Sequence, residues 1–167
     1  MTLSVAIAAR MRALLVTSLD HGEAKALVEL DASLALADGV AADQSDKLFS
    51  DRRTLAASAN EELDLSGGVT DAFGATISFV EITAILILAS PANTNAVRVG
   101  ETSATPFLAG FGASTHRWDI APGDFLFASC RAAGWGIANG ASDKLRIANA
   151  AGGSSVTYDI MIVGRSA

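Results

Sequence analysis

The chain has 167 residues, of which 50% are hydrophobic and 18% are charged, and its formal net charge at pH 7 is −6. This composition excludes a disordered chain, and the length suits one domain with a hydrophobic core. The acidic charge argues against nucleic acid and against an anionic membrane surface as partners, because both attract basic proteins. The longest apolar run, residues 82–89, is interrupted by Thr83 and falls far short of the about 20 residues that span a membrane.

Residues 1–22 are predicted to form a short N-terminal helix or an ordered arm. Val5, Ile7 and Ala9 also fit the alternation of a strand, so the pattern is ambiguous. The apolar positions with helical spacing are Leu3, Ile7, Met11, Leu14 and Leu15. No basic residue precedes the apolar part, and Arg10 and Arg12 interrupt it, so we expect a retained segment of a protein made in a cytoplasm rather than a secretory signal.

From Lys25 onward the hydrophobic period changes to two. Val28, Leu30 and Leu34 share one face, whereas the intervening positions are mostly polar. This alternation predicts a half-buried strand that ends at Asp38–Gly39. We place the boundary between the arm and a β-domain of residues 23–167 just before this strand.

Residues 41–53 are polar and are expected to form a surface loop. Asp43, Asp46 and Asp51 lack the alternate ligand spacing, the central glycine and the terminal glutamate of a calcium loop, so we expect no metal there. Arg52 and Arg53 are the only adjacent basic pair in the sequence, and a solvated turn is the expected setting for them.

Residues 77–89 are the most hydrophobic segment of the chain. Their β-branched content, with Gly74 before and Pro91 after them, predicts a central strand buried on both faces rather than a helix. Glu81 lies inside this strand, where an unpaired buried carboxylate would be costly. We therefore expect Glu81 at a kink of the strand or paired with an arginine, and not in a catalytic role.

Short apolar segments continue to the C-terminus, separated by Gly, Pro, Asn and Asp. In the last of them Val156, Tyr158 and Ile160 alternate with more polar residues. Altogether about eight to ten short strands are predicted, at nearly regular intervals. Such a series is typical of an all-β sandwich or barrel.

No motif in the sequence indicates catalysis, a cofactor or a metal. Cys130 is the only cysteine, which excludes an intramolecular disulfide, and it ends an apolar stretch, so a small buried side chain is expected. The glycines of Gly134–Gly140 come close to a dinucleotide-binding fingerprint, but the third is one place late, and hairpin glycines are expected instead. His21 and His116 are expected in turns or loops. We therefore expect a protein that is not an enzyme.

Several segments resemble a group of small virion proteins encoded by tailed bacteriophages, over roughly Lys25 to Gly164. They are Ala42–Phe49, Arg53–Ala59, Glu62–Gly74, Asn93–Asn95 with Val97 and Val99, Pro122–Gly123, Trp135, Asp143–Asn149 and Ser155–Ile160. These motifs are structural rather than catalytic. The resemblance therefore implies no active-site residue.

The resemblance implies a non-enzymatic structural protein of a phage virion, made in the host cytoplasm. We expect an all-β, jelly-roll-like β-sandwich of short antiparallel strands that decorates or stabilises the capsid as a homo-oligomer, with a trimer favoured. Its expected partners are the major capsid protein or other virion proteins, and the interface candidates are Leu3, Ile7, Met11, Leu14, Arg52 and Arg53. The alternative is a tail or fibre protein that binds a receptor or glycan through Trp118 or Trp135, for which core packing is the simpler role. A hydrolase on a β-scaffold is disfavoured.

Overall fold

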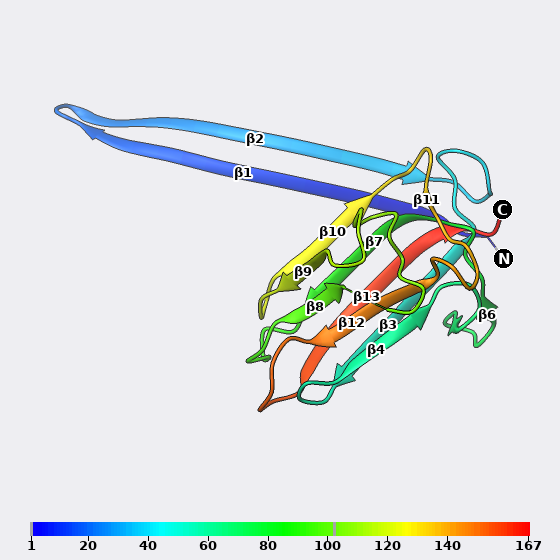
Figure 1. The fold of residues 1–167 in the computed structure, drawn as a ribbon. Coiled ribbons are helices and arrows are strands. Elements are labelled where there is room, and N and C mark those ends of the chain that lie inside the picture. Colours follow the sequence, from blue (N-terminus) through cyan, green and yellow to red (C-terminus); the bar gives the residue numbers. More distant parts are fainter. Residues whose placement is uncertain (1, 102) are drawn as a thin grey trace.

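The computed structural model describes residues 2–101 and 103–167, and these ranges contain strands and turns but no helix. Figure 1 shows two parts, a body of β-sheets and a two-stranded hairpin that projects well beyond it. We call this hairpin, residues 5–36, the arm. The predicted all-β class is confirmed.

Thirteen strands lie within the described ranges. The arm consists of β1 (Val5–Leu19) and β2 (Gly22–Leu36). The first sheet of the body contains β3 (Lys47–Leu55), β7 (Glu81–Ala89), β10 (Phe125–Ser129), β11 (Trp135–Gly136) and β13 (Val156–Arg165). The second contains β4 (Asn60–Asp64), β8 (Val97–Gly100), β9 (Arg117–Ile120) and β12 (Lys144–Asn149). A short pair is formed by β5 (Val69–Thr70) and β6 (Thr76–Ile77).

Both sheets of the body are antiparallel. The first has the order β10-β7-β13-β3, with β11 also paired to β7, and the second has the order β4-β12-β8-β9. The C-terminal strand β13 lies between β7 and β3, so the centre of the first sheet joins distant parts of the chain. Successive strands often lie in different sheets, which ties the two layers together.

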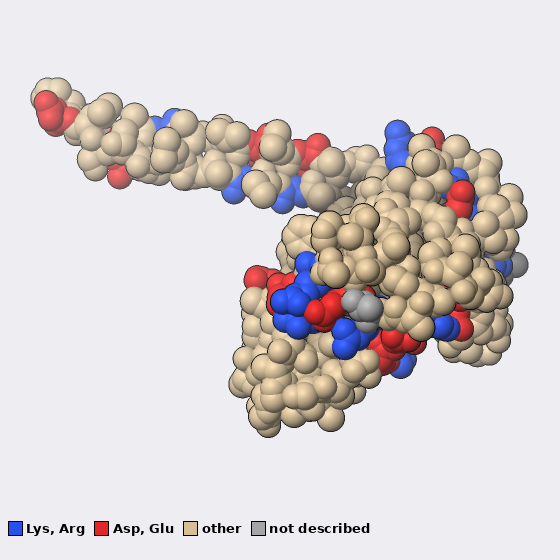
Figure 2. Space-filling view, viewed as in Figure 1, with Lys and Arg blue, Asp and Glu red and all other residues tan. Residues whose placement is uncertain are grey.

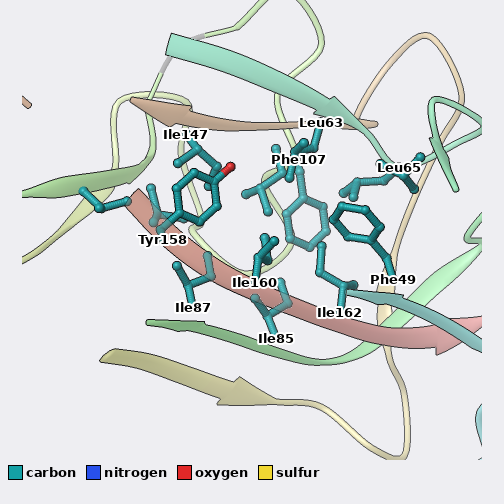
Figure 3. Close-up of a cluster of buried hydrophobic side chains, with 14 of the residues drawn as sticks. Phe49, Leu63, Leu65, Ile85, Ile87, Phe107, Ile147, Tyr158, Ile160 and Ile162 are labelled. Atoms are coloured by element: carbon teal, nitrogen blue, oxygen red, sulfur yellow. The ribbon is translucent and has the colours of Figure 1, made fainter. Parts of the chain in front are cut away.

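The hydrophobic core lies between the inner faces of these two sheets (Figure 3). Alternate residues of the central strands of the first sheet point into it, as a strand buried on one face requires. The core side chains of this sheet include Phe49, Ile85, Ile87, Tyr158, Ile160 and Ile162. Leu63 and Ile147 come from the second sheet, and Phe107 comes from the segment between β8 and β9.

The predicted central strand is present inside the first sheet as β7, which is shorter than residues 77–89 because residues 78–80 separate it from β6. The expected burial on both faces holds only for residues 82–85, since Leu88 on the outer face is 41% exposed beyond the contacts of the arm. Both alternatives expected for Glu81 occur together. Its Oε2 lies 2.5 Å from Nη2 of Arg165, and the pairing of β7 with β13 shifts register between Val163 and Gly164, next to this ion pair. The buried guanidinium also donates to the carbonyl oxygen of Ala41.

The N-terminal segment is a strand, and no helix forms there; Met1 lies outside the described residues. β1 pairs with β2 without interruption from Val5 opposite Leu36 to Leu19 opposite Gly22. This long ladder satisfies backbone groups that a short helix would have bonded within itself. The strand predicted from Lys25 is present as part of β2, but it is exposed rather than half-buried, and it belongs to the arm. The expected boundary at residues 22 and 23 therefore falls at the tip of the hairpin.

Candidate interface

One face of the arm, which we call the apolar face, is hydrophobic along its whole length. It combines the odd-numbered residues of β1 with the even-numbered residues of β2, because paired residues point to the same side. Thr17 is the only polar member of the set. The larger side chains on this face are Val5, Ile7, Met11, Leu15 and Leu19 from β1, and Val28, Leu30, Leu34 and Leu36 from β2.

The opposite face of the arm is charged over the half nearer the body. Arg10 forms ion pairs with Glu29 and Asp31, and Arg12 lies 3.7 Å from Glu29. Exposed ion pairs of this kind contribute little to stability, but they keep this face in water. Toward the tip the same face combines exposed apolar side chains, at Leu14, Val16 and Leu27, with the ion pair of Lys25 and Glu23.

The base of the arm packs against the outer face of the first sheet. Leu36 is buried there with Ala84 of β7 and Val163 of β13, and Leu3, Val5, Ile7 and Leu34 pack around them together with Leu48 and Phe127. The backbone N–H of Leu3 also donates to Oδ1 of Asp38, at 2.9 Å. These contacts anchor one end of the arm and leave the rest without cover.

The uncovered part of the arm carries large exposed hydrophobic side chains. On the apolar face, Leu15 is 73% exposed and Leu30 is 69% exposed. The others on this face are Met11, Leu19 and Val28. Soluble proteins rarely expose a contiguous apolar surface of this kind unless it is an interaction site.

A groove of about 1120 Å³ opens where the arm diverges from the body. One wall is the arm, including Ala9, Met11 and Leu30. The other wall is the outer face of the first sheet, including Leu86, Phe125, Phe127 and Met161, and Trp118 and Ile120 lie at its edge. The groove is therefore mostly apolar on both sides, with Arg10 and Asp31 on the arm and Asp119 and Asp124 on the body also in its lining, and it is continuous with the exposed face of the arm.

The structure separates the six interface candidates of the sequence. Leu3 and Ile7 pack at the base of the arm, whereas Met11 and Leu14 are exposed on its two faces. Arg52 forms a two-point ion pair with Asp159, with N–O distances of 2.6 and 2.8 Å. Arg53 is bonded to Glu61 and Asp51 within the body.

Sequence reasoning missed the contribution of β2 and of the outer face of the first sheet. The sequence predicts Leu30 on a half-buried strand, and it predicts no interface for the apolar stretch that ends at Cys130. The available signal was that residues 5–19 and 22–36 are alternating segments of equal length joined by Asp20–His21. A two-residue connection of this kind is typical of a β-hairpin.

A polar network crosses from the core to the surface at Tyr158. Its hydroxyl donates to Oε1 of Glu61 at 2.6 Å, and Arg53 Nε donates to the other oxygen of that carboxylate at 2.6 Å. Burial, and then the hydrogen bond to Glu61, raise the pKa of the Tyr158 phenol. The bond to Glu61 also raises the pKa of Arg53. The phenol therefore stays protonated and structural at neutral pH.

A second group of polar residues, which includes Asn95, Asn149 and Asp143, holds loops in place. Asn95 Nδ2 donates to Oδ1 of Asn149 at 3.0 Å and to the carbonyl oxygen of Ser154 at 3.1 Å, and Asn149 Nδ2 donates to the same carbonyl at 2.7 Å. Asp143 accepts bonds from Thr105 and from Ser66, at 2.6 and 3.1 Å. The bond from Thr105 lowers the pKa of Asp143. These motif residues thus have structural roles.

The remaining candidate groups show no catalytic arrangement. His116 lies in an exposed loop with Nδ1 2.6 Å from the carbonyl oxygen of Phe111, and Cys130 is partly buried with its thiol 3.6 Å from the carbonyl oxygen of Gly134. Within residues 2–101 and 103–167, no group of three or more His, Cys, Asp or Glu is placed to hold a metal ion. The same ranges contain no helix that is long and apolar enough to cross a membrane.

Acidic and basic side chains are intermixed on the visible face of the molecule, with no large area of one sign (Figure 2). One such group surrounds Glu101, which forms ion pairs with Arg117 and Arg146 at 2.6 and 3.0 Å. Arg98 bonds Asp119 nearby, with a 2.8 Å Nε–Oδ1 distance. The arginines are thus paired within the chain.

In comparisons with known proteins, the chain matches no protein-family model, no curated protein and no solved structure.

Proposed function

We propose that the chain is a non-enzymatic structural protein of a tailed-phage virion, and that it decorates and stabilises the capsid as a homo-oligomer, a trimer in our proposal. The exposed apolar arm is the observation that carries this proposal. The resemblance of residues 25–164 to small virion proteins supports the proposed location in a phage virion. Its partners would be the major capsid protein, other virion proteins and further copies of itself.

The energetics of the arm favour a structural partner. Isolated two-stranded hairpins are marginally stable in water, and β1 and β2 extend for 15 residues each, about 50 Å, with cover only at the base. Burial of a large apolar side chain contributes about 1.5–3 kcal/mol before the cost of association. The exposed side chains of the arm are numerous enough to drive attachment to another protein.

We infer that the body is a jelly roll. The order of its two sheets supports this topology, because eight strands form two four-stranded antiparallel sheets in which β13 lies between β3 and β7, and β12 lies between β4 and β8. The β5–β6 pair and β11 are then additions to the eight-stranded pattern. Jelly rolls are frequent in viral capsid proteins, which agrees with the proposed setting.

Virions purified from the phage that encodes the chain provide the test. Quantitative mass spectrometry should find the chain in many copies per particle, and an image reconstruction should locate the body on the outer surface of the head. Its absence from purified particles would overturn the proposal. Density for the body on the tail would overturn the proposed head location and favour the tail or fibre alternative.

The second candidate is a tail or fibre protein that binds a receptor or glycan. Trp118 favours it, because its ring is 58% exposed beside the groove, where a sugar could stack on it. Trp135 packs against the core and is the poorer candidate. A glycan array probed with the wild type and with a Trp118→Ala variant tests this function. The function requires that the wild type binds a glycan and that the variant does not.

A further inference from the structure

We propose that the tip of the arm of one copy inserts into the groove of a neighbouring copy, so that copies of this chain close into a ring by exchanging arms. The inference rests on the proposed structural function and deepens it by naming a second copy of the chain as the partner of the arm. Three features of the molecule carry it.

The first feature is that the arm and the sheet already fit each other within one chain. At the base of the arm, Val5, Ile7 and Leu34 of the apolar face pack against the outer face of the first sheet. The same sheet face continues beyond these contacts to Leu88 and Phe125, which are exposed. A second copy of the apolar face can extend there the packing that the base has begun.

The second feature is that the tip suits a groove with two apolar walls. Near the body, the arm is apolar on one face and charged on the other, at Arg10 and Glu29. Toward the tip both faces carry exposed apolar side chains, Leu15 and Val28 on one side and Leu14 on the other. The same side as Leu14 also carries the ion pair of Lys25 with Glu23, so the side chains that we expect to enter the groove are Leu14, Leu15 and Val28.

The third feature is that the arm cannot fill its own groove. Its base forms one wall, and its tip points away from the body (Figure 1). Each chain thus offers one donor, the tip, and one acceptor, the groove, at different places. Such a pair of unlike surfaces produces a ring when the rotation between copies closes, as it does in a trimer.

The area of the exchange can be estimated for each contact between two copies. The apolar side chains exposed at the tip are Leu14, Leu15, Val16, Leu19, Leu27 and Val28. At roughly 60–120 Å² each, they would cover about 350–700 Å², and the groove would lose a similar area. Each tip-in-groove contact thus buries about 350–700 Å² on each partner, below the about 800 Å² per partner of a standard interface, and each copy in a ring makes two such contacts.

Sedimentation of the purified full chain tests the exchange. The wild type should sediment as a closed oligomer. Leu15→Glu damages the donor and Phe125→Glu damages the acceptor, so each variant should weaken association at least about 30-fold and sediment as a monomer. An equimolar mixture should regain a heterodimer, because Phe125→Glu still has an intact arm and Leu15→Glu still has an intact groove.

Phe73→Glu is the matched control. Phe73 is 80% exposed and does not line the groove, so this variant should keep the oligomer. The proposal is overturned by a monomeric wild type at every concentration, by dissociation with Leu15→Glu but not Phe125→Glu, or by a mixture that stays monomeric. Virion mass spectrometry is independent of this result, so the exchange and the virion function can fail separately.

Discussion

The arm and the body are built from the same kind of alternating strand, yet their apolar faces meet opposite environments. In β13, Ile160 and Ile162 are at most 2% exposed, whereas Met11 and Leu15 of β1 are 72% and 73% exposed. The body has a second sheet that covers the inner face of the first, and the arm has no second layer within the chain beyond its base. Alternation therefore specifies a strand and its apolar side, but burial depends on what packs against that side.

The largest expected effect comes from placing the same charge in each region. Ile85→Asp would put a carboxylate between the sheets of the body, with no partner, and should destabilise the fold by more than about 4 kcal/mol. Leu15→Asp places it on the exposed arm and should leave the body folded. Solubility and thermal unfolding followed by circular dichroism compare the two.

This comparison would fail in either of two ways. A soluble, folded Ile85→Asp protein would remove β7 from the core. An unfolded Leu15→Asp protein would mean that the arm stabilises the body and is not an independent projection.

A second effect concerns the register shift of the body, a feature that the straight ladder of the arm lacks. A Cβ at Gly164 would lie 2.3 Å from the carbonyl oxygen of Glu81 and 2.6 Å from the ring of Phe79. Gly164→Ala must therefore move backbone, and we expect a loss near the upper end of about 1–3 kcal/mol in urea unfolding. Gly136→Ala, with no atom within 4 Å of the new Cβ, is the control and should change stability by less than about 1 kcal/mol. Equal losses of unfolding free energy in the two variants would show that the backbone around Gly164 accommodates a Cβ without loss of stability.

The sequence predicted the body better than the arm, for a physical reason. Residues 77–89 are apolar on both faces, which predicted a strand inside a sheet, although the structure buries both faces only over residues 82–85. An arginine partner for Glu81 was predictable because an unpaired carboxylate within an apolar strand would be costly, although Arg165 itself was not, since it is 84 residues away in the sequence. In the structure Arg165 is the buried member of the pair, whereas the Glu81 side chain is 32% exposed.

The N-terminal segment could not be resolved in the same way. Leu3, Ile7, Met11 and Leu14 fit a helical face, while Val5 and Ile7 fit a strand, and only the pairing with β2 decides between them. The groove was unpredictable because its two walls are distant from each other in the sequence. One wall comes from β1 and β2, and the other comes from β7 and β10. Sequence patterns report on local periodicity, whereas an interface between two regions depends on the tertiary fold.

A smaller effect is a pH dependence confined to the body. The bond from Thr105 lowers the pKa of Asp143 from its ordinary value of 3.8. A carboxyl whose pKa is lower in the folded state contributes stability above its unfolded-state pKa, and this contribution is lost as the pH falls through the folded-state pKa. Asp143→Asn should cost about 1–2 kcal/mol at neutral pH, and its difference from the wild type should narrow below about pH 4.

Urea unfolding from neutral to acidic pH measures this difference. Thr105→Val removes the donor that lowers the pKa of Asp143 most. We therefore expect the stability of this variant, like that of Asp143→Asn, to depend less on pH in the acid range than the stability of the wild type does. A gap between wild type and Asp143→Asn that stays constant with pH would contradict the assigned cause.

The smallest expected effect tests the hydroxyl of Tyr158, a polar group on a side chain of the core. Tyr158→Phe removes the hydroxyl that donates to Glu61 and keeps the ring in the core. Because Arg53 still holds the carboxylate, the loss should be only about 0.5–1.5 kcal/mol. Glu61→Gln and the double variant complete a mutant cycle by urea unfolding, and a coupling between the two positions of about 0.5 kcal/mol or more is expected. Additive single losses would mean that the hydroxyl and the carboxylate stabilise the body independently, and that the phenol is retained for the packing of its ring.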